Sequence, residues 1–132
     1  MLFSEKYLGG TTLITVLVVE DNPSELALIC EYIRQGEYNI ITASDGTDGL
    51  AKFERLKPDV IITDLVMPGM SGLELCRAIK RLSSKVPVIA CTSKDQELDR
   101  FWGMRQGIDV YITKPFTKDE ILQALRSLKV GI

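Results

Sequence analysis

The sequence contains no histidine and only three cysteines, which restricts the chemistry that the chain can perform. Metal sites built on imidazole and thiolate ligands are excluded, and so is nucleophilic catalysis by Ser-His-Asp or Cys-His groups. The cysteines, Cys30, Cys76 and Cys91, form no C-x-x-C pair, and each lies within an apolar periodic run. We therefore expect three buried, reduced thiols and a cytoplasmic location.

Long apolar segments and a strong charge bias are lacking as well. The longest apolar stretches have the length of strands, so no transmembrane helix is expected, and the N-terminus lacks the apolar core of a signal peptide. The net charge of the chain is −2, and the 16 basic and 18 acidic residues are scattered along the sequence. This balance argues against nucleic acid and against a membrane surface as binding partners.

Strand-like and helix-like segments alternate five times after an N-terminal extension, residues 1–12, that we expect to be loose. Five such units in this order predict an α/β fold in which residues 13–132 form a single domain. The expected architecture is a doubly wound, flavodoxin-like, five-stranded parallel sheet of order 2-1-3-4-5 with five helices. The expected strands cover 13–19, 38–43, 58–64, 86–91 and 109–113, and the expected helices cover 25–35, 45–56, 71–82, 95–106 and 117–128.

Chemically active side chains follow four of the five predicted strands at their carboxyl ends. Glu20 and Asp21 follow the first strand, Asp64 ends the third, Thr92 follows the fourth and Lys114 follows the fifth. Ligand sites of doubly wound sheets form beyond the carboxyl ends of the strands, at the switch between the first and third strands. We therefore expect three acids, one hydroxyl and one amine to converge at this edge.

The three acids predict a site for a hard divalent cation. Clustered carboxylates repel one another unless a cation neutralises them, and in the absence of histidine the suitable ion is Mg²⁺ with oxygen ligands. A Mg²⁺ ion beside Asp64, Lys114 and a hydroxyl group suits phosphoryl transfer, in which an aspartate can itself be the nucleophile.

Four segments in this order and spacing resemble the receiver domain of bacterial two-component response regulators, of the chemotaxis-regulator type. They are VLVVEDNP, IITDLVMPGMSG, VIACTS and YITKPF, and the resemblance extends over about residues 13–129. It implies that Asp64 accepts a phosphoryl group from a histidine kinase or phosphotransfer protein. It also implies that Asp21 binds Mg²⁺ directly, Glu20 mainly through water, and that the backbone carbonyl of Val66 is a further ligand.

The resemblance assigns the remaining site residues to the response to phosphorylation. Thr92 would hydrogen-bond one phosphoryl oxygen and Lys114 would pair with another. Tyr111 would be an aromatic switch that turns inward when Thr92 moves, and the Lys114–Pro115 bond would be cis. Simpler interpretations are a helix cap for Thr92 and a half-buried strand aromatic for Tyr111.

The implied function is that of a single-domain response regulator rather than an enzyme, with only self-phosphorylation and slow self-dephosphorylation. Phosphorylation would change the surface around residues 95–128 and thereby the binding of a downstream protein. The segment SKDQELDRFWGMRQG, residues 93–107, resembles the corresponding segment in receivers of type IV pilus, twitching-motility and phototaxis pathways. Trp102 within it is either part of a contact surface or packed against a neighbouring helix.

Two other functions are compatible with parts of this pattern. The chain would be a docking module if it were never phosphorylated, although the intact set of Asp21, Asp64, Thr92 and Lys114 argues against this. A small Mg²⁺-dependent phosphatase of the haloacid-dehalogenase type needs a second acid two residues after the nucleophile. That position holds Val66, which argues strongly against a phosphatase.

Overall fold

The computed structural model describes residues 7–8, 11–93 and 104–128. The helix expected over residues 95–106 falls largely outside these ranges, and only Met104 and Arg105 are described as helical. The expectations for Trp102 also lie outside the described residues.

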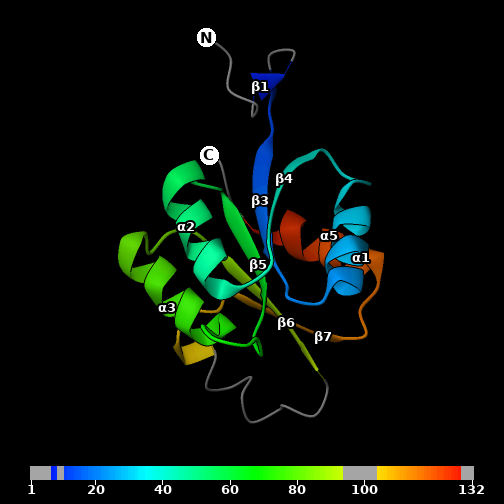
Figure 1. Ribbon diagram of the computed structural model, residues 1–132. Helices are drawn as coiled ribbons and strands as arrows, with labels where there is room; N and C mark the ends of the chain where they lie inside the picture. The colour runs from blue at the N-terminus through cyan, green and yellow to red at the C-terminus, as the bar shows by residue number, and fades with distance from the viewer. Residues whose placement is uncertain (1–6, 9–10, 94–103, 129–132) are drawn as a thin grey trace.

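Five parallel strands form the centre of the molecule (Figure 1). They are β3 (Ile14–Val19), β4 (Tyr38–Ala43), β5 (Val60–Asp64), β6 (Val88–Ser93) and β7 (Val110–Lys114). Their spatial order is β4-β3-β5-β6-β7, with every neighbouring pair parallel. This is the order 2-1-3-4-5, so the prediction of a doubly wound sheet is confirmed.

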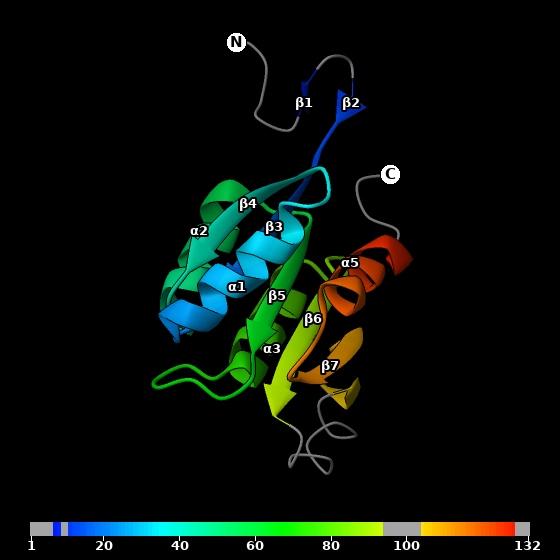
Figure 2. The same cartoon turned by 90° about the vertical axis from the view of Figure 1, so that its right-hand side faces the viewer.

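The described helices cover both faces of this sheet (Figures 1 and 2). On one face lie α1 (Pro23–Ile33) and α5 (Lys118–Ser127), and on the other lie α2 (Gly46–Leu56) and α3 (Gly72–Leu82). Among these helices, none has the length and apolar character needed to cross a membrane.

Polar side chains fix the point at which each of these helices begins. The side chains of Asn22, Asp45, Ser71 and Thr117 each accept a hydrogen bond from a backbone N–H in the first turn. At α3 and α5 a glutamate in the first turn returns the bond to the cap residue, which completes a capping box. The cap at Asn22 starts α1 at Pro23, a residue suited to the first helical position because its missing N–H would have no partner there.

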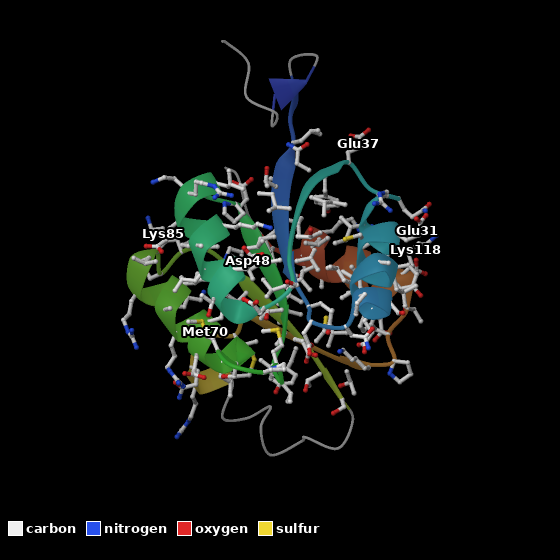
Figure 3. All side chains as sticks on the ribbon, in the orientation of Figure 1. Glu31, Glu37, Asp48, Met70, Lys85 and Lys118 are labelled. Carbon is white, nitrogen blue, oxygen red and sulfur yellow. The ribbon has the colours of Figure 1, made fainter. Side chains whose placement is uncertain are left out.

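The core divides into two layers because successive side chains of a strand point to opposite faces. Leu17 and Val19 of β3 pack toward α2 and α3, whereas Val16 and Val18 pack toward α1 and α5. Charged side chains such as Glu31, Lys118 and Asp48 lie on the outer surfaces of the helical layers (Figure 3). The three cysteines are buried and free, as predicted.

The structure departs from the predicted elements at β6 and in the N-terminal extension. Strand β6 begins at Val88 instead of Val86, because Pro87 has no N–H to contribute to the ladder, and it extends to Ser93, which is paired with Lys114. The N-terminal extension contains two short strands, β1 (Tyr7–Leu8) and β2 (Thr11–Thr12), which pair antiparallel at the end of the molecule opposite the carboxyl ends of the sheet strands (Figure 2).

Candidate functional site

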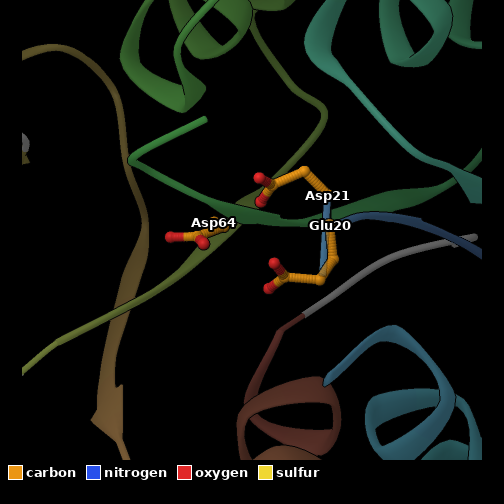
Figure 4. A group of neighbouring side chains, drawn as sticks. All are labelled: Glu20, Asp21 and Asp64. Atoms are coloured by element: carbon orange, nitrogen blue, oxygen red, sulfur yellow. The ribbon is translucent and has the colours of Figure 1, made fainter. Parts of the chain in front are cut away.

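The three predicted carboxylates meet at the carboxyl ends of β3 and β5 (Figure 4). These strands are direct neighbours, and Val19 pairs with Thr63, so the residues that follow them lie side by side. One carboxylate oxygen from each of Glu20, Asp21 and Asp64 lies within 4.8 Å of the others. Parallel pairing therefore brings together acids that are 43 or 44 positions apart in the sequence.

The amine of Lys114 lies against this cluster from the end of β7. Its Nζ atom donates to Glu20 Oε1 and to Asp64 Oδ2, both at 3.2 Å. A third carboxylate, Glu25 in the first turn of α1, also forms an ion pair with Lys114. The peptide bond between Lys114 and Pro115 is cis, as predicted.

Backbone groups hold the two inner carboxylates in place. Glu20 Oε2 accepts from the N–H of Asn22 at 3.1 Å, and Asp64 Oδ1 accepts from the N–H of Val66 at 3.3 Å. The main chain is fixed as well, because the Glu20 N–H donates to the Ala43 carbonyl at 3.1 Å. Both carboxylates therefore have restricted orientations beside the amine.

Burial and neighbouring charges shift the pKa values of Glu20 and Lys114. The Glu20 side chain is only 1% exposed, and burial, reinforced by the nearby charge of Asp64, raises its pKa to about 7 despite the Asn22 hydrogen bond and Lys114. Burial of the Lys114 amine disfavours its charge, but the hydrogen bond to Glu25 and the charges of Asp64 and Glu20 outweigh this effect. The pKa of Lys114 is therefore raised above its usual value.

The donor set fits a hard divalent cation. All three clustered residues offer carboxylate oxygens, and Asp21 is exposed to solvent, so a cation can reach the cluster without unfolding it. One amine does not balance three acids, and a cation beside Glu20 would offset the cost of burying its charge. The backbone of Val66 follows Asp64 in the adjacent loop, and its side chain is exposed.

The two predicted switch residues lie on neighbouring strands next to this cluster. Thr92 on β6 is buried and pairs with Thr113, while the preceding Cys91 pairs with Asp64 across the β5–β6 ladder. Tyr111 on β7 packs against the core layer on the side of α2 and α3, and its hydroxyl oxygen is buried.

Two residues near the site were not identified from the sequence. Glu25 forms an ion pair with Lys114, and the available signal for this contact was its position four residues after Asp21, at the predicted start of a helix. Gly72 lies at the start of α3 directly against the backbone of Asp64, where a Cβ atom would lie 2.0 Å from the Asp64 carbonyl oxygen. The glycine-containing segment Pro-Gly-Met-Ser-Gly, residues 68–72, was the sequence signal for this close approach.

Comparison with known proteins identifies the family to which this site belongs. The model of the response regulator receiver domain matches residues 16–126, which include every site residue described above. The chain belongs to the response regulator receiver domain family. Its resemblance to receivers, inferred from four short segments, is thereby confirmed.

Curated relatives of this receiver include proteins of about its own length and proteins about twice as long. It is 36% identical over 118 residues to protein PilH of Pseudomonas aeruginosa, covering 88% of this chain and 98% of PilH. It is 35% identical over 113 residues to the regulatory protein PhoP of Bacillus subtilis, covering 86% of this chain but 47% of PhoP. The receiver thus spans nearly all of PilH and about half the length of several other curated relatives.

Solved structures confirm the fold. The chemotaxis protein CheY4 of Vibrio cholerae superposes with a TM-score of 0.84 and 28% identity, covering 89% of this chain and 100% of that chain. A receiver domain protein of Clostridium thermocellum gives a TM-score of 0.83 at 30% identity, covering 87% and 93% of the two chains.

Proposed function

We propose that this receiver accepts a phosphoryl group on Asp64 from a histidine kinase or phosphotransfer protein and signals by a change in protein binding. The observation that supports this proposal is the position of the Asp64 carboxylate, which lies in a three-acid cluster and 3.2 Å from the amine of Lys114. Rigid placement at a strand end presents a nucleophile to an incoming phosphoryl donor with little further reorganisation.

In the proposed reaction an oxygen of Asp64 attacks the phosphorus of the donor. The new O–P bond forms while the bond from phosphorus to the imidazole nitrogen breaks, and the leaving imidazole keeps the electron pair and takes up a proton. Later attack by water would return the free carboxylate and inorganic phosphate. When bound in the acid cluster, Mg²⁺ would supply positive charge that offsets the charge on the phosphoryl oxygens.

Each residue around Asp64 has a proposed role in this reaction. Asp21 and Asp64 would hold Mg²⁺ directly, Glu20 mainly through water, and Val66 through its backbone carbonyl. Lys114 would pair with a phosphoryl oxygen, because its amine already lies beside Asp64 and its raised pKa keeps it charged. Thr92 would hydrogen-bond another phosphoryl oxygen.

The output would pass through Thr92 and Tyr111 to the surface around residues 95–128, of which the structure describes 104–128. The Tyr111 side chain packs against the core from β7, the strand next to the one that carries Thr92. A shift of Thr92 would therefore displace the packed side chain of Tyr111. The altered surface would change the affinity for a downstream protein. The segment 93–107, which resembles receivers of type IV pilus and twitching-motility pathways, favours a role in motility control.

A receiver that docks without being phosphorylated is the second candidate. It is less well supported, because a docking module would not require a buried glutamate and a lysine to be held beside Asp64. A phosphatase is disfavoured because the position two residues after Asp64 is an exposed valine, Val66.

The test is incubation with acetyl phosphate and Mg²⁺ followed by intact-mass measurement. We expect the wild-type chain to gain one phosphoryl group and Asp64→Asn to gain none. Asp48→Asn is the matched control, because Asp48 lies on α2 outside the acid cluster and its partly exposed side chain pairs with Lys52. Absence of any mass gain in folded, Mg²⁺-loaded protein would favour the docking module, and turnover of a generic phosphomonoester would favour the phosphatase.

A further inference from the structure

The carboxylates that contact Lys114 differ in what they can do when the site is loaded. Glu20 and Asp64 belong to the acid cluster suited to a cation, whereas Glu25 is not part of that cluster. The side chain of Glu20 is 1% exposed and that of Asp64 is 13% exposed, but that of Glu25 is 39% exposed. Glu25 is therefore the partner of Lys114 that can move into solvent at little cost.

A cation bound by Glu20 and Asp64 would compete with the amine for these two carboxylates. Among the described residues, Glu25 would then be the remaining carboxylate that pairs with Lys114. The pair lines a groove of about 350 Å³ between α1 and the segment after β7, together with Leu28, Pro115 and Phe116. This groove is open to solvent, so the rotation of Glu25 away from the amine is not blocked by packing.

We infer that Glu25 is a positioning residue that holds the amine of Lys114 in a resting location and competes with the phosphoryl group for it. The inference rests on the proposed function, because it assigns Lys114 to the phosphoryl group on Asp64. A phosphoryl oxygen and the Glu25 carboxylate would then compete for the charge of the same amine. Glu25 thus lowers the affinity of the site for phosphoryl groups and restrains Lys114 when none is bound.

Removal of the Glu25 charge should therefore favour the loaded site. Glu25→Gln keeps the length and shape of the side chain but replaces a charge-assisted hydrogen bond with a weaker neutral one. Partly exposed ion pairs contribute little, so we expect the affinity of the Mg²⁺-loaded protein for beryllofluoride, a phosphoryl analogue, to rise by about two- to fivefold. Glu25→Asp retains the charge on a shorter side chain, so its beryllofluoride affinity should lie between those of the wild type and Glu25→Gln.

The matched control is Glu31→Gln. Glu31 lies on the same helix and pairs with Arg34 at 3.2 Å, and its side chain is 62% exposed, so this variant makes the same charge change away from Lys114. Its beryllofluoride affinity should equal that of the wild type. Urea unfolding of all variants verifies that α1 remains folded when a first-turn acid is removed.

The decisive measurement is NMR of the Lys114 side chain, assigned by its loss in Lys114→Arg. With Mg²⁺ and no phosphoryl analogue, the Lys114 signals should report a restrained amine in the wild type and in Glu31→Gln, but a mobile amine in Glu25→Gln. This readout does not require phosphorylation, so it distinguishes a failure of the inference from a failure of the proposed function. An unchanged Lys114 signal in Glu25→Gln would overturn the inference. So would a beryllofluoride affinity equal to or below that of Glu31→Gln.

Discussion

Gly72 at the start of α3 provides a strong test of how the fold positions Asp64. A Cβ atom at this position would lie 2.0 Å from the carbonyl oxygen of Asp64 and 2.7 Å from the Cα atom of Leu65. Carbon–oxygen contacts in proteins are rarely shorter than about 3.3 Å, so Gly72→Ala requires a displacement of more than about 1 Å. Because the opposing atoms belong to the backbone, no side-chain rotation can provide that space.

The expected cost follows from these contacts. Overpacking of this kind costs about 1–3 kcal/mol, and displacement of the helix start also weakens the 3.0 Å hydrogen bond from the Gly72 N–H to the Leu65 carbonyl, worth about 1 kcal/mol. Reduced freedom of the unfolded chain returns about 0.5 kcal/mol. Gly72→Ala should therefore lower the free energy of unfolding by about 2–3 kcal/mol, which is a shift of about 1–2 M in the urea midpoint.

Urea unfolding followed by circular dichroism measures this loss, and intact-mass measurement after acetyl phosphate treatment shows whether Asp64 is still modified. We expect slower modification, because the displaced atoms belong to Asp64, the proposed nucleophile. Gly69→Ala is the comparison, since a Cβ there meets nothing within 4 Å and only the backbone angle φ of +75° is unfavourable. It should cost about 1 kcal/mol and leave modification unchanged. A Gly72→Ala protein as stable as the wild type would refute the reasoning.

Two further predictions concern the buried thiols and the loop before β7. Burial raises the pKa of Cys76 to about 11 and that of Cys91 to about 12, so both should react with Ellman's reagent at pH 8 only after unfolding. Because the folded chain keeps these protons above the ordinary thiol pKa of 9.0, the free energy of unfolding should fall as the pH rises from about 9 towards 11, measured by urea titration at each pH. Asp109 Oδ2 accepts from both Lys80 Nζ and the Val88 N–H at 2.8 Å, so Asp109→Ala should lower the free energy of unfolding by about 1–2 kcal/mol. Lys80→Met should cost less in the same urea assay, because it leaves the Val88 bond intact.

The sheet and its site could be predicted because both depend on signals repeated along the chain. Five apolar runs gave the strands, and their alternation with helices gave the order that places Asp64 beside Asp21. In the five strands of the sheet and the helices that cover it, the described parts differ from the prediction only at the ends of elements, where single residues decide the outcome. Pro87, for example, delays the start of β6 to Val88.

The N-terminal strands show a different limit of sequence reasoning. Each of β1 and β2 contains two residues, too few for a periodic pattern, although the Gly-Gly pair between them is a recognised hairpin signal. The contact of Glu25 with Lys114 could not be predicted either. It depends on the side-chain direction of a first-turn residue and on the reach of a long amine, neither of which has a sequence pattern.

The contact with Glu25 matters because of the charge balance of the whole site. Four carboxylates and one amine carry a formal charge of −3, and a divalent cation would leave −1. The proposed phosphorylation would replace the single charge of Asp64 with a group of about −1.5 to −2, so the demand for positive charge at Asp64 would rise. Lys114 is the cation already in place, and Glu25 is its most exposed partner. Under the proposed function, the simplest response to phosphorylation would therefore be a shift of Lys114 from Glu25 towards the phosphoryl group.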